Sequence, residues 1–538
     1  MTIATDSSQP AGTPQAKLAG KPRGKHAFAA PAAPTSYAWG KADWVSTGVI
    51  AVLAFITRFI RLSAPVSQGT PVFDEKHYVP QAFDMVRSWD NLFIGGIESN
   101  PGYGLVVHPP LAKQIIAVSE SVFGYSPLGW RLMAALFGVG TVLLTMALAR
   151  RVAGSWQVAT MAGLIAVCDG VLLVSSKFGM LDIFQVFFIV AAAWALAHDH
   201  NQMRLRLHTA FITGNMGSSD FGPRLGFRWW RFTAGVFLGL ALGVKWSGLY
   251  YIMFFGLLSV FSDLALRRRY HVRRYVLGTL IRDTPAALAS LVLVPLAIYV
   301  WTWRAWFASE TSVFRHAKVD GTIAEDSPLQ ALPDALAGWF YYHSSVLEFH
   351  ASLTTSSGHS HPWDSKPWAW LVAARPILYY SSTDLQCSGA GTCRKMLYLF
   401  GTPAIWWLVI PAVLWGLWSL LVRRNRAFLI PLVGFAAGFL PWLAAFDRQM
   451  YFFYATAFIP FVIVLISLAL GQMIGHGKKI SWDWLTSLAG GEIRTGTFVA
   501  ICYLCLVVTM FIYFSPILYG FMIPDKWYES MMWLNSWT

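Results

Sequence analysis

Charged residues and cysteines are both scarce in this chain. Asp, Glu, Lys and Arg together make up 13% of its 538 residues, whereas hydrophobic residues make up 56%. The 5 cysteines are too few for the framework of a disulfide-rich extracellular domain. Because the mean hydropathy is +0.49, the composition argues against a soluble enzyme with buried parallel strands.

Several motifs that bind nucleotides or activate nucleophiles are also missing. The sequence has no Walker A motif, no Gly-x-Gly-x-x-Gly after a strand and no Gly-x-Ser-x-Gly elbow. It also lacks the Asp-x-Asp motif of metal-dependent nucleotide-sugar transferases. ATP-driven transport and transfer from a nucleotide sugar therefore lose support, and a membrane-borne donor fits better.

What the chain has instead is a series of apolar runs of roughly 20 residues, the length that crosses a hydrocarbon layer of about 30 Å. Tryptophan (26) and phenylalanine (37) are abundant, as expected of helices anchored at both membrane surfaces. We therefore predict an all-α polytopic membrane protein. About eleven transmembrane helices are expected, at 44–62, 128–149, 156–174, 180–198, 230–246, 247–264, 284–303, 397–421, 427–445, 450–472 and 497–518.

The basic residues predict how these spans are oriented. The net charge is +14, and Lys and Arg gather in short clusters between spans, such as Arg150–Arg151, Arg267–Arg269 and Arg423–Arg426. The positive-inside rule places such clusters in the cytosol, where they can also contact anionic lipids. No nucleic-acid partner is implied. His198-Asp199-His200 falls on the same side and is expected to be a solvated helix end.

The predicted topology divides the chain into two parts. Residues 1–42 are rich in Ala, Pro, Ser, Gly and Lys and are expected to form a disordered cytosolic N-terminus. Residues 43–538 are expected to form one transmembrane domain. Threading the spans alternately places the loops 63–127 and 304–396 and the C-terminal tail on the external side.

The first external loop, 63–127, contains a dense group of ionisable residues. Asp74 and Glu75 are adjacent, His77 and Tyr78 follow directly, and His108 lies toward the other end of the loop. Neighbouring side chains point in different directions, so one acid can face a reacting group while the other orients it or holds a second ligand. A solvated pair of loop carboxylates is the alternative interpretation.

The same loop has a helical pattern. Val79, Phe83, Val86 and Phe93 recur at roughly helical spacing, which predicts a helix lying in the membrane interface. The prolines after His108 fix an extended approach to a second helix of this kind. We therefore expect interfacial helices in the first external loop.

Further ionisable residues lie at the predicted external ends of spans, where a charge is costly and usually marks a ligand path or an internal pair. They are Arg58, Arg131, Lys177, Asp182, Lys245 and Arg448. For Arg58 we expect a side chain that reaches the headgroups. For Arg131, Lys245 and Arg448 we expect a phosphate site, because Arg contacts phosphate in a bidentate manner and Lys as a point charge.

The second external loop, 304–396, offers aromatic and imidazole side chains. His343 and Trp363 suit packing against a sugar or a peptide. His361 forms a His-x-His motif, but no carboxylate or cysteine pattern completes a metal site, so no metal is expected. Cys387 and Cys393 are separated by a short flexible segment, and an external location favours a local disulfide between them.

Taken in chain order, these residues resemble the protein O-mannosyltransferases that use polyprenyl- or dolichyl-phosphate-mannose. The resemblance covers nearly all of the chain except residues 1–42. It is carried by TRFIRL (57–62), FDEKHY (73–78), HPPLAK (108–113), GWRLMAALFG (129–138), LD (181–182), LGVKWSG (242–248), HPWDSKPW (361–368) and DRQMYFFYATAFIPF (447–461).

The resemblance implies a multispan, lipid-donor glycosyltransferase fold of the GT-C type and an inverting transfer of mannose from a lipid phosphate to Ser or Thr. By this resemblance Asp74 is the base and Glu75 positions the mannose or the acceptor. The residues expected to hold the lipid phosphate are Arg131, Lys245, Lys113 and Arg448. Those expected to contact the sugar or the acceptor are His77, Tyr78, His108, Asp182, His343, His361 and Trp363.

One departure narrows the resemblance. Eukaryotic members carry a β-trefoil insertion in the second external loop, and the segment 304–396 has no room for it. The chain therefore resembles a bacterial, actinobacterial-type member at the cytoplasmic membrane, with polyprenyl-phosphate-mannose as donor and no cofactor. Exported Ser/Thr-containing polypeptides, coupled to the secretion translocon, are the expected acceptors.

Two alternatives stay open from the sequence. The first is another polyprenyl-phosphate-sugar glycosyltransferase that acts on a lipid or a glycan. The second is a lipid or solute transporter, which the grouping of ionisable residues on one external face, rather than at mid-membrane, argues against.

Overall fold

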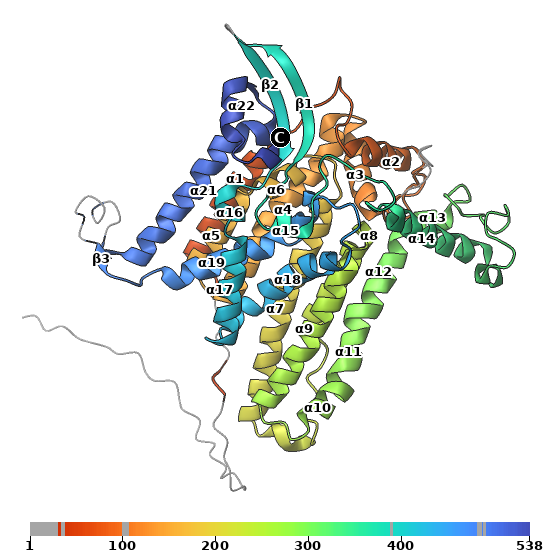
Figure 1. Ribbon diagram of the computed structural model, residues 1–538. Helices are drawn as coiled ribbons and strands as arrows, with labels where there is room; N and C mark the ends of the chain where they lie inside the picture. Colours follow the sequence, from red (N-terminus) through yellow and green to blue (C-terminus); the bar gives the residue numbers. More distant parts are fainter. Residues whose placement is uncertain are drawn as a thin grey trace, which may run out of the picture.

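The computed structural model describes residues 31–33, 38–98, 107–387, 391–480, 482, 487 and 491–538. The predicted disordered segment 1–42 lies largely outside these residues, although the first helix already begins at Lys41. Figure 1 shows a bundle of long helices with a small β-sheet and several short helices at one end. We call this the sheet end of the molecule.

Among the described residues, eight helical segments are long and apolar enough to cross a membrane. They are α1 (Lys41–Phe59), α4 (Pro127–Ala153), α7 (Asp182–Ile212), α9 (Gly248–Arg269), the run α10–α12 (Tyr275–Thr302), α16–α17 (Pro403–Leu421), the run around α18 (Arg426–Ala444) and α21 (Thr495–Tyr519). Shorter apolar helices are α5 (Trp156–Val167), α8 (Trp229–Val244) and α19 (Ile459–Met473). Every predicted span overlaps one of these helices, but the count of eleven stays a prediction because three are shorter than about 20 residues.

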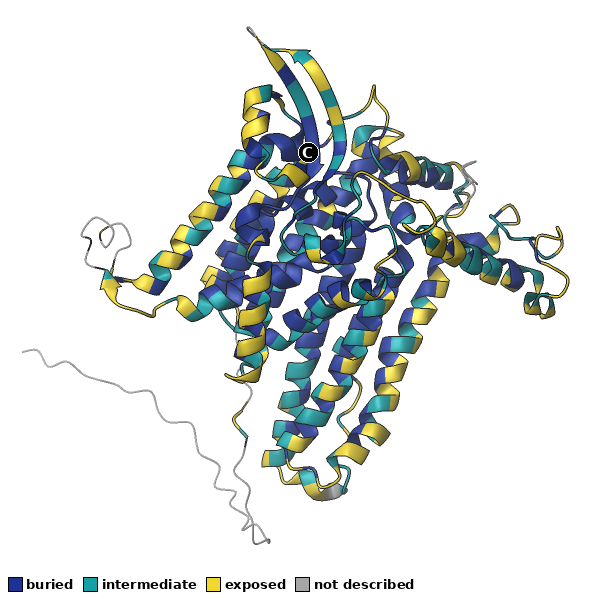
Figure 2. Ribbon diagram, viewed as in Figure 1, coloured by how far each residue is buried: buried dark blue, intermediate teal, exposed yellow. Residues whose placement is uncertain are grey.

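Helix α7 forms the centre of the bundle. In its most apolar stretch, 78% of the residues are buried, against 22% in α21 and 28% in α10–α12. Figure 2 shows exposed positions along α21 and α12 (Val294–Thr302), whose exposed apolar residues include Ile512 and Leu296. Apolar side chains exposed on peripheral helices are those that a hydrocarbon layer would cover.

Two helices occupy the first large loop, as expected. Helix α2 (Glu75–Arg87) and helix α3 (Leu111–Phe123) pack against each other beside the N-terminal part of α4. The buried face of α2 includes Tyr78, Val79, Ala82 and Met85, spaced three and four residues apart. Phe93 lies beyond the end of the helix and is exposed, so the predicted stripe is right only in part.

The sheet corrects the all-α expectation. Strands β1 (Ile377–Gln386), β2 (Thr392–Leu399) and β5 (Met522–Pro524) form an antiparallel sheet in the order β1-β2-β5. The predicted span 397–421 therefore starts too early, because residues 397–399 end β2 and helix begins at Pro403. A short apolar run of this kind cannot be assigned to strand or helix from periodicity alone.

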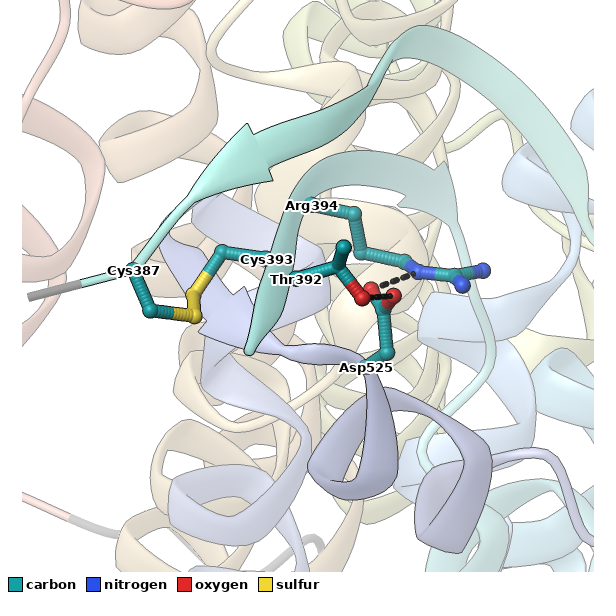
Figure 3. The surroundings of a disulfide bond; sticks show 5 residues. All are labelled: Cys387, Thr392, Cys393, Arg394 and Asp525. Carbon is teal, nitrogen blue, oxygen red and sulfur yellow. Dashed lines mark hydrogen bonds and ion pairs between the residues drawn. A yellow bond between two sulfur atoms is a disulfide. The ribbon is translucent and has the colours of Figure 1, made fainter. Parts of the chain in front are cut away.

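A disulfide links Cys387 to Cys393 across the hairpin, as the sequence analysis expected. Figure 3 shows this bond beside Arg394, whose Nε donates to the Asp525 carboxylate at 2.6 Å. Thr392 donates to the same carboxylate. The hairpin is therefore fastened both to itself and to α22 (Asp525–Met531).

The remaining elements are short, apart from α14. They are α6 (Gly170–Ser175), α13 (Arg304–Ala308), α14 (Asp334–Ser352), α15 (Pro367–Trp370), β3 (Lys479–Ile480) and β4 (Ile493–Arg494). The described part of the segment 304–396 holds α13, α14, α15 and the hairpin.

The prediction that Arg58 reaches the headgroups is wrong. Its side chain is fully buried and donates to the carbonyl oxygens of Ala166 at 2.9 Å and Val167 at 3.0 Å. These are carbonyls of the last turn of α5, which have no partner within their own helix. Arg58 therefore fastens α1 to the end of α5.

Candidate active site

Asp74 stands at the N-terminal boundary of α2, and its position follows from the residues on either side. Phe73 has φ 52°, in the left-handed region that side chains rarely adopt, so the chain turns sharply just before the acid. The Phe73 ring stacks on Tyr379 of β1 with centroids 4.2 Å apart. This contact holds the turn against the sheet.

Glu75 fixes the other side of Asp74. Its fully buried carboxylate accepts hydrogen bonds from Arg131 Nε at 2.9 Å and Arg131 Nη2 at 2.7 Å. The backbone N–H groups of Gly179 and Val72 donate to it at 2.7 and 3.2 Å. A carboxylate with four donors and no exposed surface is a structural anchor for the start of α2.

The Arg131 side chain is used entirely in internal contacts, of which the pair with Glu75 is one. It is fully buried, and besides Glu75 its guanidinium donates to the carbonyl oxygens of Leu62 at 3.1 Å and Pro65 at 2.9 Å. It also lies over the Phe178 ring, 4.4 Å from the centroid. This geometry does not fit the phosphate contact expected of Arg131, nor the contact with mannose or acceptor expected of Glu75.

The carboxylate of Asp74, by contrast, accepts no hydrogen bond and forms no ion pair within the described part of the chain. It is half-buried. Burial is the main reason that its pKa rises to about 6; Asp182 adds to the rise, while His77 and Lys245 oppose it. Asp74 is therefore a carboxylate of raised basicity without an internal partner, as a general base requires.

Lys245 and Asp182 form an ion pair beside Asp74. The Lys245 ammonium lies 2.8 Å from Asp182 Oδ1 and 5.2 Å from the centroid of the Phe453 ring. The second carboxylate oxygen, Asp182 Oδ2, is buried and has no hydrogen-bond partner in the described residues. An acceptor atom left open next to a base is a candidate contact for a substrate hydroxyl.

A group of rings and one arginine completes the site. The His108 ring lies between Tyr78 and His350, with centroid distances of 5.9 and 5.7 Å. Arg448 Nη2 donates to His350 Nδ1 at 3.3 Å. Burial and Arg448 lower the pKa of His350 to about 4, so the imidazole is neutral and can accept.

Arg448 is the cation of this group that has no carboxylate partner among the described residues. Its Nε is buried without a hydrogen-bond partner, and its guanidinium lies 5.7 Å from the centroid of the Trp442 ring. An arginine with donors to spare, beside neutral imidazoles, is a suitable contact for a phosphate group.

Several expected site residues have other partners. Lys113 is buried and pairs with Glu98, and its ammonium also donates to the His108 carbonyl at 3.2 Å. His343 accepts from the Tyr299 hydroxyl at 2.6 Å and donates to the Trp339 carbonyl at 2.7 Å. In this conformation Lys113 and His343 use these polar atoms for internal contacts and not for contacts with a phosphate, a sugar or an acceptor.

His361 and Trp363 lie farther along the second external loop. His361 is exposed and contacts Tyr451, and the Trp363 ring packs under Arg375 with a distance of 4.7 Å to its centroid. His77 is exposed on the first turn of α2 and acts electrostatically on Asp74. Their expected contacts with sugar or acceptor stay predictions.

Sequence reasoning missed His350, Tyr379 and Tyr454. The charge of Asp74 acts on both tyrosines, and Arg448 acts on Tyr454 and His350, so all three belong to the same cluster. They come from α14, β1 and the 3₁₀ turn 452–457, far apart in the chain. Nothing in their local sequence distinguishes them from packing aromatics.

The arrangement combines a base, an open acceptor and a free cation within one cluster at the sheet end. A carboxylate of this kind can accept a hydroxyl proton, and an arginine with donors to spare can hold a negatively charged phosphate group. No group of three potential metal ligands occurs among the described residues. A cluster of this kind can serve the reaction of a hydroxyl group with a phosphate-bearing substrate.

The comparisons with known proteins point to the same chemistry. Residues 127–308 match the family model for dolichyl-phosphate-mannose-protein mannosyltransferase. Residues 335–537 match the model for the C-terminal four-transmembrane region of protein O-mannosyltransferase. Together the two matches cover most of the chain outside the first loop.

Close relatives carry the corresponding name. A polyprenol-phosphate-mannose–protein mannosyltransferase of Corynebacterium glutamicum is 63% identical over 518 residues, which cover 96% of this chain and 98% of the relative. A protein of the same name from Mycobacterium tuberculosis is 45% identical and is covered to 92%. In fold, the chain is similar to the S. cerevisiae protein O-mannosyltransferase Pmt1–Pmt2 complex bound to the sugar donor, with a TM-score of 0.67, 15% identity and 92% of both chains covered. The chain therefore belongs to the protein mannosyltransferase family, whose members are membrane-spanning glycosyltransferases of the GT-C fold.

Proposed function

We propose that this enzyme transfers mannose from polyprenyl-phosphate-mannose to Ser and Thr hydroxyls of exported proteins, with inversion at the anomeric carbon. The observation that carries the proposal is the Asp74 carboxylate, half-buried and without an internal partner among the described residues, beside Lys245 and Asp182 in a member of this family. The named activity of the Corynebacterium relative supports the choice of donor and acceptor.

In the proposed step, the acceptor oxygen attacks the anomeric carbon from the face opposite the phosphate. The carbon–oxygen bond to the lipid phosphate breaks, its electron pair leaves with the phosphate, and the hydroxyl proton passes to Asp74. A single displacement of this kind inverts the anomeric centre and needs a base but no protein nucleophile. A phosphate is already a good leaving group, so cationic contacts can replace a general acid.

We assign the leaving phosphate to Arg448, supported by Lys245. Arg448 has a buried donor without a partner, and Lys245 is close enough to act on both Asp74 and His108. Asp182 holds Lys245 in place and offers its open oxygen to a sugar hydroxyl. Glu75 and Arg131 then act as positioning residues that hold the start of α2.

The orientation of the enzyme belongs to the proposal. Arg150–Arg151 and Arg267–Arg269 lie in the last turns of α4 and α9, and Arg423–Arg426 follows the end of α17, away from the sheet end. The positive-inside rule then gives a cytosolic N-terminus and an external active site on the cytoplasmic membrane. The disulfide at the sheet end agrees with an external location. Exported polypeptides, coupled to the secretion translocon, would reach such a site directly.

The test uses detergent-purified protein, polyprenyl-phosphate-mannose labelled in the sugar, and a Ser/Thr-rich peptide. The expected result is label on peptide hydroxyls, removable by an α-mannosidase and not by a β-mannosidase. Label that moves only to an added lipid or glycan would make the enzyme a different lipid-donor transferase. A donor that binds without any transfer would contradict the proposed reaction.

A further inference from the structure

A cavity lies far from Asp74. It has a volume of about 620 Å³ and is enclosed by the C-terminal ends of α4 and α17, the second halves of α7 and α9, and the start of α18. These are the ends of the bundle opposite the sheet (Figure 1). The cavity is not part of the catalytic cluster, because none of its lining residues belongs to that cluster.

Helix α7 gives the separation between the two sites. Asp182, beside Asp74, begins the helix, and His200 lines the cavity eighteen residues later. At about 1.5 Å per residue this is roughly 27 Å along the axis, close to the thickness of the hydrocarbon layer. The cavity therefore lies at the opposite membrane surface from the active site.

One wall of the cavity is a closed ionic network. Arg228 donates to Asp199 at 2.9 Å and to Asp263 at 2.5 Å, and Arg231 adds a longer contact to Asp263 at 3.4 Å. All four residues of this network are buried. The expectation that Asp199 lies in a solvated helix end is therefore wrong, since the residue ties α7 to the start of α8.

Both aspartates of the network are paired with Arg228, so neither is available to the other arginines that line the cavity. Four more arginines line the cavity, namely Arg151, Arg204, Arg269 and Arg426, and none forms an ion pair with a described residue. Arg204 and Arg269 are both close enough for their positive charges to act on Arg426. The Nε of Arg204 is buried without a hydrogen-bond partner. A cluster of like charges that contains an unsatisfied buried donor is costly unless an anion joins it.

The rest of the lining is apolar. Phe254, Leu258 and Val433 contribute to it. Leu257 and Phe261 of α9 also line the cavity, although they are 52% and 62% exposed on the surface of the molecule. Since α9 is a membrane-crossing helix, the cavity opens toward the region that lipid chains occupy. An arginine-lined end and a lateral apolar opening match the two halves of a phosphate-bearing lipid.

We propose that this cavity binds the phosphate headgroup of an anionic membrane lipid, with Arg204 and Arg426 as its principal contacts. The hydrocarbon chain lies along Leu257 and Phe261 and leaves through the side opening of α9. The bound lipid neutralises the unpaired arginines and fills the space between α7, α9 and α18. This site is independent of the mannose donor, which binds at the opposite membrane surface.

The test measures binding of phosphatidylglycerol to delipidated protein in detergent, by native mass spectrometry, for wild type, Arg204→Gln, Arg426→Gln and the double variant. Each arginine near a lipid surface contributes about 1 kcal/mol, so each single change should weaken binding about fivefold, and the double change should weaken it more than either single change. Arg268→Gln is the matched control, because Arg268 is exposed in the last turn of α9 and does not line the cavity. It removes the same charge and should leave the affinity unchanged.

Parallel titrations identify the source of the phosphate. Phosphatidylcholine, polyprenyl phosphate and inorganic phosphate are each compared with phosphatidylglycerol in the same variants. Arginine-dependent binding of either anionic lipid supports the site and shows which lipid fills it. Equal affinities in wild type and the double variant, an equal loss in Arg268→Gln, or binding of inorganic phosphate alone would overturn the proposal. The melting temperatures of the lipid-free variants are compared with that of the wild type. Equal values show that a loss of lipid binding does not come from misfolding.

Discussion

The buried pair of Glu75 and Arg131 allows a direct test of how the active site is held together. Each partner has 0% side-chain exposure, and Arg131 Nη2 lies 2.7 Å from Glu75 Oε2. Replacing Glu75 by Gln leaves a buried guanidinium without its counter-ion, and replacing Arg131 by Gln leaves a buried carboxylate without its own. The structure therefore predicts large and similar losses of stability for the two variants.

The expected size follows from the burial. Removing one partner of a fully buried ion pair costs about 3–5 kcal/mol, because the remaining charge keeps its desolvation cost. The double variant Glu75→Gln/Arg131→Gln removes both charges, so it should lose little more than either single variant. The coupling energy is then close to one single loss, about 3 kcal/mol or more, at the upper end of values measured for contacting residues. Glu492→Gln breaks the exposed pair with Lys479 and, as a control, should cost at most about 1 kcal/mol.

The assay is unfolding of the detergent-solubilised protein in increasing SDS, combined with donor-lipid binding at low SDS. If the pair positions α2, the two single variants lose similar amounts of stability. The double variant then loses clearly less than the sum of the two single losses. A different pattern would refute this reasoning: Arg131→Gln that unfolds like wild type but no longer binds the donor. Arg131 would then be a phosphate contact, as its place in the family resemblance implied.

Three further predictions concern the base, the leaving group and the hairpin. Because the pKa of Asp74 is raised to about 6 and the charged form is the base, kcat/KM should rise with pH to a midpoint near 6, and a midpoint near 4 would contradict its burial. Arg448→Gln should weaken donor binding about tenfold to a hundredfold, the loss of one hydrogen bond to a charged group, whereas Lys526→Gln, at an exposed lysine of α22, should not. Replacing Cys387 and Cys393 by Ser should destabilise the hairpin locally by about 2 kcal/mol for a loop with a sequence separation of 6, seen as faster proteolysis there, and unchanged proteolysis would show that β5 and α22 alone hold it.

The helical bundle could be predicted because each membrane helix is encoded locally. An apolar run such as 497–518 needs no distant partner to satisfy its backbone, and the structure places α21 at Thr495–Tyr519. The Cys387–Cys393 bond is also local. Strand β2 was missed since its apolar end, 397–399, reads like the start of a helix until its pairing with β1 is known.

The candidate site could be predicted only in outline. The acid pair, Lys245 and Arg448 stand out because charges are rare in this chain. Which charge faces a ligand depends on partners far away in sequence, such as Arg131, which lies 56 residues after Glu75. His350 has no local signal at all, since its role rests on contacts with Arg448 and His108.

The most direct test of the central claim is a comparison of wild type and Asp74→Asn in two measurements on the same preparation. One is transfer of labelled mannose to a Ser/Thr peptide, and the other is binding of polyprenyl-phosphate-mannose. A general base contributes about a hundredfold to ten-thousandfold to rate, so transfer should fall at least a hundredfold while donor binding stays within a few fold of wild type. Transfer at the wild-type rate in Asp74→Asn would contradict the assignment of Asp74 as the base.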